Sequence, residues 1–123
     1  MTRRALLPVV LALAAATLHG CSDEEPGARA RGDRAAVAAD DFRYRPQLIR
    51  ARPGSLRFDL VNRGRLAHTF RVSRKGTEIA KVSSLLPGER ATKSVRVRAG
   101  EYRFFCALAN HEELGMYGTL TVR

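Results

Sequence analysis

The sequence predicts an all-β fold, an antiparallel sandwich or barrel, for residues 35–123. Three observations lead to this prediction: short segments alternate between apolar and polar residues, turn residues separate these segments, and no segment has a convincing amphipathic helical pattern. Short strands at regular intervals are typical of sandwiches and barrels. A chain of 123 residues holds one small domain at most, and about 90 residues suffice for one core of this kind.

The predicted strands follow one another along the chain, each with one apolar face. Leu56, Phe58 and Leu60 alternate with polar residues, and the same period of two recurs around residues 69–72, 95–98 and 119–122. Alternation of this kind places every second side chain on a buried face. Turn signals separate the segments and lie at Pro53-Gly54, Asn62-Arg63-Gly64, Lys75-Gly76, Pro87-Gly88 and Ala99-Gly100.

The N-terminal segment has the layout of a secretory signal peptide over residues 1–20. Arg3 and Arg4 form a short positive region, and residues 6–18 form an apolar run that is too short to span a bilayer comfortably. We therefore expect the mature protein to be exported. Two cysteines in an exported chain first suggest a disulfide.

The end of the signal segment resembles a bacterial lipobox at Leu18, Gly20 and Cys21, although His19 is unusual at its position. The resemblance implies cleavage before Cys21 and acylation of that residue, which anchors the protein to a membrane facing the periplasm or the cell exterior. The alternative is ordinary secretion, with Cys21 free or removed. Residues 21–34 contain no large apolar residue and are interpreted as a lipidated flexible tether.

The chain is strongly basic, with a formal net charge of +10 that falls to +8 when Arg3 and Arg4 are removed with the signal peptide. A basic domain can bind nucleic acid, anionic lipid or an acidic partner. We expect no nucleic-acid partner, because an exported protein rarely meets nucleic acid. The arginines alternate with apolar residues along the predicted strands, which is typical of a solvated face. A patch for an acidic partner is the alternative.

Three soft or borderline donors lie in one short segment near the C-terminus. Cys106, His111 and Met116 are each separated from the next by four residues, and His68 is the other candidate nitrogen donor. Two imidazoles, a thiolate and a weak thioether form the ligand set of a blue-copper electron-transfer site. If Cys21 carries lipid, Cys106 has no disulfide partner, and metal ligation explains the odd thiol. Each residue taken alone is more typical of core or loop packing.

The strand pattern brings these donors toward one end of the domain. His68 has the same parity as Phe70, and Cys106 has the same parity as Phe104, so both are expected on the core side of strand ends. His111 and Met116 follow in the loop before the last strand.

Residues 42–123 resemble the cupredoxins, the plastocyanin- and azurin-like small blue copper proteins. The segment YRFFCALANHEELGMYGTLTV is similar to the azurin and auracyanin type of ligand loop, FDLVNRGRLAHTFRV resembles the first ligand region, and FRYRPQLIRARPGSLRF resembles the opening hairpin. The resemblance implies a Greek-key β-sandwich of about seven or eight strands over residues 35–123. It also implies one copper ion, with His68 and His111 as nitrogen ligands, Cys106 as the thiolate and Met116 as the long axial thioether.

Two positions depart from the family pattern without removing a ligand. Ala109-Asn110 replaces a frequent Pro-Gly pair before the loop histidine, and asparagine tolerates the left-handed backbone of such a turn. Thr69 replaces an asparagine that ties the two ligand loops together, and its hydroxyl can donate a similar, shorter bond. Both changes affect the surroundings of the ligands.

The sequence therefore predicts an electron carrier between redox partners outside the cytoplasm, not an enzyme, because four protein ligands leave no open coordination position. Zinc is the competing metal, although a thioether adds little for zinc. A copper carrier or storage protein and a metal-free interaction module are the alternative functions. We expect a monomer that docks redox partners, with acidic surfaces, around Ala67, Leu108, Ala109 and Leu114.

Overall fold

The computed structural model describes residues 27–123, which form ten strands and no helix. No helix in this range is therefore available to cross a membrane. The predicted signal peptide, the predicted lipidation of Cys21 and residues 21–26 of the predicted tether lie outside the described residues. The strands are β1 Ala28–Arg29, β2 Arg34–Asp40, β3 Arg43–Arg45, β4 Leu48–Ala51, β5 Gly54–Asn62, β6 His68–Arg74, β7 Thr77–Leu85, β8 Arg90–Val97, β9 Gly100–Phe105 and β10 Tyr117–Val122.

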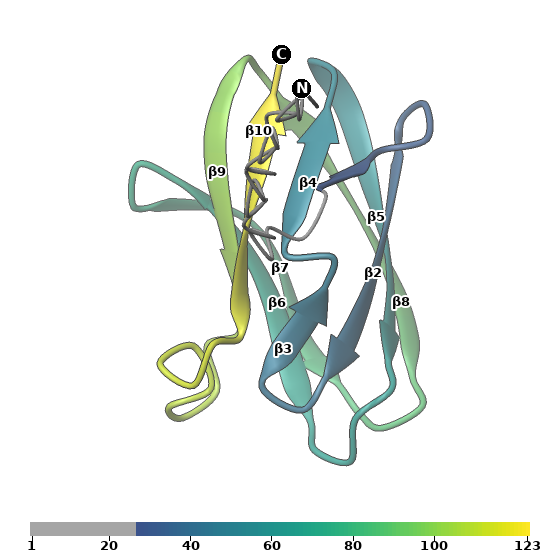
Figure 1. The fold of residues 1–123 in the computed structure, drawn as a ribbon, viewed down its shortest axis with the longest axis vertical. Helices are drawn as coiled ribbons and strands as arrows, with labels where there is room; N and C mark the ends of the chain where they lie inside the picture. Colours follow the sequence, from purple (N-terminus) through teal and green to yellow (C-terminus); the bar gives the residue numbers. More distant parts are fainter. Residues whose placement is uncertain (1–26) are drawn as a thin grey trace, which may run out of the picture.

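The strands form two facing sheets, as the predicted sandwich requires (Figure 1). One sheet has the order β1-β4-β10-β9-β6-β7 and the other has the order β3-β2-β5-β8. The chain passes from one sheet to the other between β3 and β4, so one sequence segment contributes to both. If β3 and β4 are taken as one interrupted strand and the short β1 is set aside, the remainder matches the predicted strand number.

The prediction of purely antiparallel sheets was wrong, because both sheets are mixed. Strand β2 pairs in parallel with β5, β4 pairs in parallel with β10, and β1 pairs in parallel with β4. Alternation of side chains reveals which face of a strand is buried, but it carries no information about the strand beside it. The long connections between sheets place strands that are distant in the sequence next to one another.

Strand pairing begins before residue 35. Ala28 and Arg29 pair with Ile49 and Arg50, and the pairing of β2 with β5 starts at Arg34. Backbone hydrogen bonds form these pairs. They need no large apolar side chains, so the composition of this stretch gave no sign of them. The part of the segment from residue 28 onward therefore lies against the sheets.

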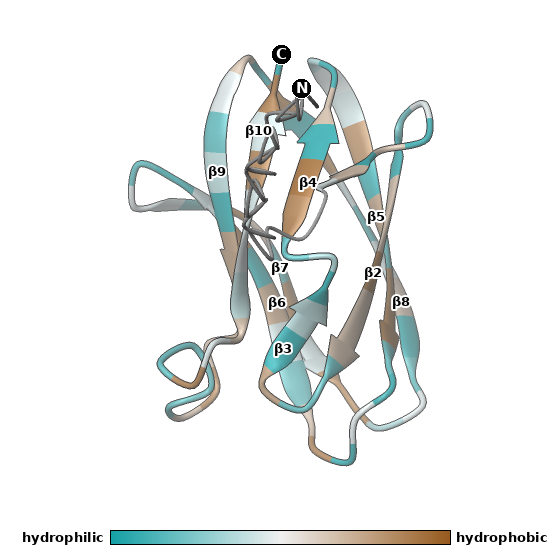
Figure 2. Cartoon of the chain, viewed as in Figure 1, coloured by the Kyte–Doolittle hydropathy of each residue, from teal (hydrophilic) through white to brown (hydrophobic). Residues whose placement is uncertain are grey.

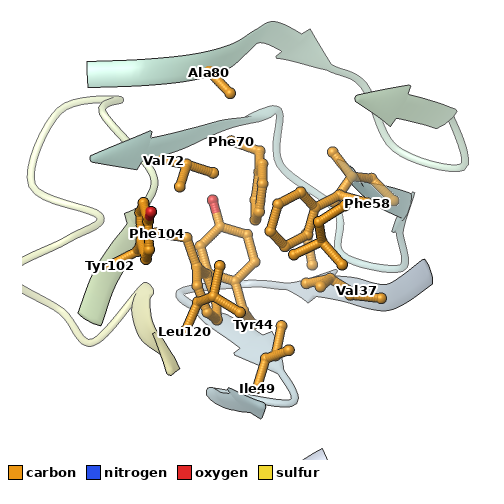
Figure 3. Close-up of a cluster of buried hydrophobic side chains, with 14 of the residues drawn as sticks. Val37, Tyr44, Ile49, Phe58, Phe70, Val72, Ala80, Tyr102, Phe104 and Leu120 are labelled. Carbon is orange, nitrogen blue, oxygen red and sulfur yellow. The ribbon is translucent and has the colours of Figure 1, made fainter. Parts of the chain in front are cut away.

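The apolar faces of the two sheets meet in one core. Along β5 the side chains of Leu56, Phe58 and Leu60 are buried while their neighbours are not, as the period of two predicts. The alternation of hydrophobic and hydrophilic residues along the strands is visible in Figure 2. Aromatic rings occupy the centre of the core, and they come from β3, β5, β6 and β9 (Figure 3).

The lower end of the sandwich in Figure 1 gathers the β2–β3 turn, the β5–β6 loop and the long β9–β10 loop. These connections come from distant parts of the chain and from both sheets. Gly118 allows a close approach at the start of β10, because an added Cβ there collides with the Phe104 ring and the Gln47 carbonyl. Gly115, in the loop just before β10, has a φ of +111°, a backbone conformation that glycine adopts without steric cost.

Candidate metal centre

Three of the four candidate ligands converge at this lower end. His68 is the first residue of β6, Cys106 follows β9 directly, and His111 lies in the β9–β10 loop. One donor atom from each of these residues lies within 4.8 Å of the donor atoms of the other two. The side chains of His68 and Cys106 are buried and that of His111 is partly exposed. The geometry is therefore that of three donors around one shared point.

Met116 is held beside these residues by the backbone of its own loop. The Cys106 N–H donates to the Met116 carbonyl at 3.0 Å, and the Met116 N–H donates to the His111 carbonyl at 3.0 Å. The Met116 side chain is completely buried. The loop thus folds back so that the residue bearing the thioether is hydrogen-bonded to both of the loop residues that supply donors.

The state of His68 fits a metal ligand. Its side chain is completely buried, and within the described residues neither ring nitrogen has a hydrogen bond of normal geometry. Nε2 has a long contact of 3.4 Å with Asp41 Oδ1. Nδ1 has no hydrogen-bond partner in this part of the chain. Burial lowers the pKa of the His68 imidazole, against the opposing effect of Asp41. A neutral imidazole with an unused lone pair is the form that binds a metal.

The sulfur of Cys106 is surrounded by donors. The Thr69 backbone N–H donates to Sγ at 3.4 Å, and the Thr69 hydroxyl lies 3.7 Å from the same atom. His111 Nδ1 lies 3.5 Å from Sγ. A thiolate, two imidazoles and a buried thioether are a donor set that fits one copper ion.

Thr69 joins the two ligand segments, as predicted for the residue that replaces asparagine. Its hydroxyl oxygen accepts a hydrogen bond from the Ala107 N–H at 2.8 Å, next to the bond toward Cys106. Strict alternation with Phe70 would place Thr69 on the outer face, but its side chain is buried. The pairing of β6 with β7 shifts register between His68 and Phe70, and the ligand loop covers Thr69 at this irregularity.

Tyr44 supports Thr69 from the hydrophobic core. Its hydroxyl donates to the Thr69 carbonyl, and its ring packs against Phe70 with a centroid separation of 5.6 Å. Burial raises the pKa of Tyr44 far above its usual range, and the negative charge of Cys106 adds to this effect. The hydroxyl therefore stays protonated and acts as a donor.

Removing the Tyr44 hydroxyl is expected to destabilise the protein. Tyr44→Phe leaves the Thr69 carbonyl without its donor in a buried position, which costs about 1–3 kcal/mol. Denaturant unfolding of the metal-free protein measures the loss. Tyr117→Phe is the matched control, because Tyr117 is exposed and keeps its contact with Arg103 through the ring alone. Equal stability of the two variants would contradict the prediction.

Two residues of the β2–β3 turn contact the site, and the sequence analysis assigned neither of them a role. Asp41 approaches His68, and the Phe42 ring meets the His111 ring edge to face, with centroids 5.0 Å apart and an interplanar angle of 84°. The backbone N–H of Arg65 donates to the Asp41 carboxylate, and this holds the pKa of Asp41 below its usual range. The signal in the sequence that could have indicated these contacts was an aspartate followed by a phenylalanine in a turn.

The turn before His111 has the predicted kind of backbone at a different residue. Ala109, not Asn110, has a positive φ, of 40°. The sequence predicted this conformation at Asn110, because asparagine tolerates it better. The Leu108 carbonyl accepts a hydrogen bond from the His111 N–H at 3.0 Å, so Ala109 is the first of the two central residues of this turn.

Comparison with known proteins agrees with the fold. Residues 6–122 match the family model of the cupredoxin-like domain, so the chain belongs to the cupredoxin-like family. No curated protein matches the sequence significantly.

Solved structures share the fold at low sequence identity. Reduced auracyanin from the photosynthetic bacterium Roseiflexus castenholzii has a TM-score of 0.69 and 19% identity, over 79% of this chain and 99% of that chain. Auracyanin A, a "blue" copper protein from the green thermophilic photosynthetic bacterium Chloroflexus aurantiacus, has a TM-score of 0.65 and 14% identity, over 73% and 98%. Rusticyanin from Thiobacillus ferrooxidans has a TM-score of 0.60 and 16% identity, over 77% and 80%.

Proposed function

We propose that this protein is a type 1 (blue) copper protein that carries single electrons between redox partners outside the cytoplasm. The observation that supports this most directly is the convergence of His68, Cys106 and His111 within 4.8 Å, with Met116 buried in the same loop. Copper bound there supplies one-electron cycling between Cu(II) and Cu(I). The four side chains are the proposed ligands, with Met116 as the weak axial one.

The chain holds these ligands in a fixed arrangement. His68 starts a central strand of its sheet, and Cys106 is tied to Thr69 and to Met116 by hydrogen bonds. Ligands that barely move suit a centre whose oxidation state changes, because little has to rearrange when an electron arrives. With four protein ligands no position is open to a substrate, which supports electron transfer over catalysis.

The end of the domain that contains the site also presents apolar side chains to solvent. The hydrophobic colour recurs in the loops at this end in Figure 2. The exposed large apolar residues in these loops are Leu66, Leu86, Leu108 and Leu114. His111 is the partly exposed ligand among them. A small apolar surface next to a ligand suits brief docking with a redox partner, and arginines elsewhere on the basic surface can steer an acidic one.

Copper loading of residues 22–123 tests the proposed function. A carrier is expected to show an intense blue thiolate-to-copper absorption band and reversible one-electron voltammetry. Irreversible redox behaviour with ready release of copper to a chelator would indicate a copper carrier instead. A colourless protein that retains zinc would indicate a zinc site, and absence of bound metal would indicate an interaction module.

Replacement of Met116 is expected to change the redox properties and leave copper binding in place. Met116→Leu removes a weak sulfur donor and leaves a side chain of similar volume, so the cupric state loses more than the cuprous state and the reduction potential rises. Voltammetry measures the shift and metal analysis confirms the bound copper. An unchanged potential would show that Met116 is not the axial ligand.

We also propose that the protein is held at a membrane by acylated Cys21, which lies outside the described residues. Cys21→Ala is expected to prevent acylation and to move the protein from the membrane fraction to the soluble fraction after the signal peptide is removed. Fractionation of cells that express the two forms is the measurement. If the substituted protein lacks acyl groups and still sediments with membranes, another anchor holds it.

A further inference from the structure

The Asp41 carboxylate lies at the junction of the two sheets, next to a proposed metal ligand. Asp41 follows β2 in the four-stranded sheet, whereas His68 begins β6 in the six-stranded sheet. Asp41 Oδ1 is 3.4 Å from His68 Nε2. We propose that Asp41 is a positioning residue for the metal: it keeps the His68 ring proton on Nε2, directs Nδ1 to the metal, and favours the cupric over the cuprous state.

The carboxylate is itself fixed by the loop that leads into His68. The backbone N–H of Arg65 donates to Oδ1 at 3.0 Å and to Oδ2 at 3.1 Å, and the N–H of Leu66 donates to Oδ1 at 3.1 Å. Gly64 packs so closely on the carboxylate that an added Cβ there collides with Oδ1. A carboxylate that accepts three such bonds is oriented before any metal binds, and it is not a mobile surface group.

The position of this carboxylate decides which ring nitrogen of His68 is free. A neutral imidazole carries one proton, and a carboxylate oxygen can only accept it. Because Oδ1 faces Nε2, the proton is favoured on Nε2 and the lone pair on Nδ1. In the described part of the chain neither ring nitrogen has a hydrogen bond of normal geometry, but Nε2 is the one that has a carboxylate oxygen 3.4 Å away. The two nitrogens of one ring are thus assigned separate tasks, one toward the carboxylate and the other toward the metal.

The charge of Asp41 acts in the same direction. A carboxylate close to the outer nitrogen raises the basicity of a ligand imidazole. It also stabilises the state of the site with the greater positive charge, which is the cupric state. The Arg65 guanidinium is one nearby cation, with Nε 3.9 Å from Asp41 Oδ2, but its side chain is 96% exposed. Solvent therefore screens this pair, so Arg65 offsets little of the carboxylate charge.

Phe42, the residue after Asp41, contacts the second histidine, His111. Phe42 has a left-handed backbone, with a φ of 63°, and its ring packs edge to face against His111. The rings of His68 and His111 lie 5.3 Å apart. The β2–β3 turn therefore contacts both proposed nitrogen ligands from outside. A turn of the smaller sheet thus packs against the ligand residues of the larger sheet.

Asp41→Asn tests the charge while it keeps an oxygen in the position of Oδ1. Changes to a residue that hydrogen-bonds a metal ligand typically cost 10–100-fold in metal affinity, and we expect a loss of about tenfold that falls mainly on Cu(II). A tenfold change in the Cu(II)-to-Cu(I) affinity ratio corresponds to a rise of about 59 mV in the reduction potential. Asp41→Ala, which removes the acceptor as well, is expected to weaken Cu(II) binding toward the upper end of that range.

Asp40→Asn is the matched control. Asp40 is the neighbouring carboxylate, and it pairs with Arg45 at 2.6 Å on the outer surface, away from His68. This variant removes the same charge one residue earlier. We expect a potential close to that of the unchanged protein, because Asp40 pairs with Arg45, whereas Asp41 is the carboxylate that approaches His68. A potential shift in Asp40→Asn equal to that in Asp41→Asn would overturn the proposed local role.

NMR of the His68 ring nitrogens in the metal-free protein separates this proposal from the proposed function on which it rests. The unchanged protein is expected to carry the proton on Nε2, and Asp41→Ala is expected to show a mixture of tautomers. This readout needs no copper, so it holds even if the protein carries no electrons. Melting of the metal-free variants measures the structural contribution. A lower melting temperature with an unchanged tautomer and an unchanged potential would reduce Asp41 to a loop-stabilising residue and overturn the proposal.

Discussion

Cys106→Ser is expected to abolish the blue absorption band of the copper-loaded protein, because the sulfur supplies the charge-transfer transition. Copper binding is also expected to weaken by more than the 10–100-fold typical of changes outside the ligand set, since a serine hydroxyl is not a thiolate donor. The Cys106 sulfur accepts from the Thr69 N–H and hydroxyl in a buried position. A serine oxygen can accept the same bonds, so the fold should be retained.

Absorption spectra and metal analysis at equal protein concentration measure the effect of Cys106→Ser, and circular dichroism verifies the sheet content. Thr69→Ser is a matched control that leaves all four donors in place and keeps a hydroxyl beside the sulfur. It is expected to retain the band with a shift in position. A blue band of full intensity in Cys106→Ser would show that the thiolate at residue 106 is not the ligand.

The sequence was sufficient to predict the class of the fold and the faces of its strands. The buried positions of Leu56, Phe58 and Leu60 follow from the period of two, and the turns fall where glycine precedes or follows a strand. The pairing of the strands could not be predicted in the same way. Parallel neighbours such as β4 and β10 are far apart in the chain, and their contact depends on which of several apolar faces meet in three dimensions.

The candidate site was predictable to the extent that it is local in the chain. Cys106, His111 and Met116 lie in one loop whose spacing limits how far apart they can be, and parity placed His68 on the core side. Asp41 reaches the site only because the β2–β3 turn of one sheet faces the β5–β6 loop of the other. A single carboxylate in a polar turn has no periodic pattern that indicates this contact. The left-handed backbone at Ala109 was similarly hidden, because alanine is not a residue type that favours this conformation.

Gly118→Ala is expected to be among the most destabilising single-methyl changes in the protein. Gly118 lies in β10 between the Phe104 ring and the Gln47 carbonyl, and an added Cβ comes closer to both than real carbon atoms do. The carbonyl cannot move away easily, because it accepts the Thr119 N–H at 2.7 Å. Overpacking of this kind costs about 3 kcal/mol, which corresponds to a fall of roughly 10–20 °C in melting temperature for a domain of this size.

Gly76→Ala separates crowding from backbone strain in this experiment. Gly76 has a φ of +81° and nothing within 4 Å of an added Cβ, so the same methyl group meets only the cost of a left-handed conformation. That cost is about 1–2 kcal/mol, and calorimetry of both metal-free variants should therefore rank Gly118→Ala as the less stable. Because the Phe104 ring packs on Tyr44, whose hydroxyl bonds to the Thr69 carbonyl, Gly118→Ala should also perturb the copper spectrum while Gly76→Ala leaves it unchanged. Equal melting temperatures for the two variants would mean that β10 can shift to admit the methyl group, and the proposed rigidity of the framework around the metal would then be wrong.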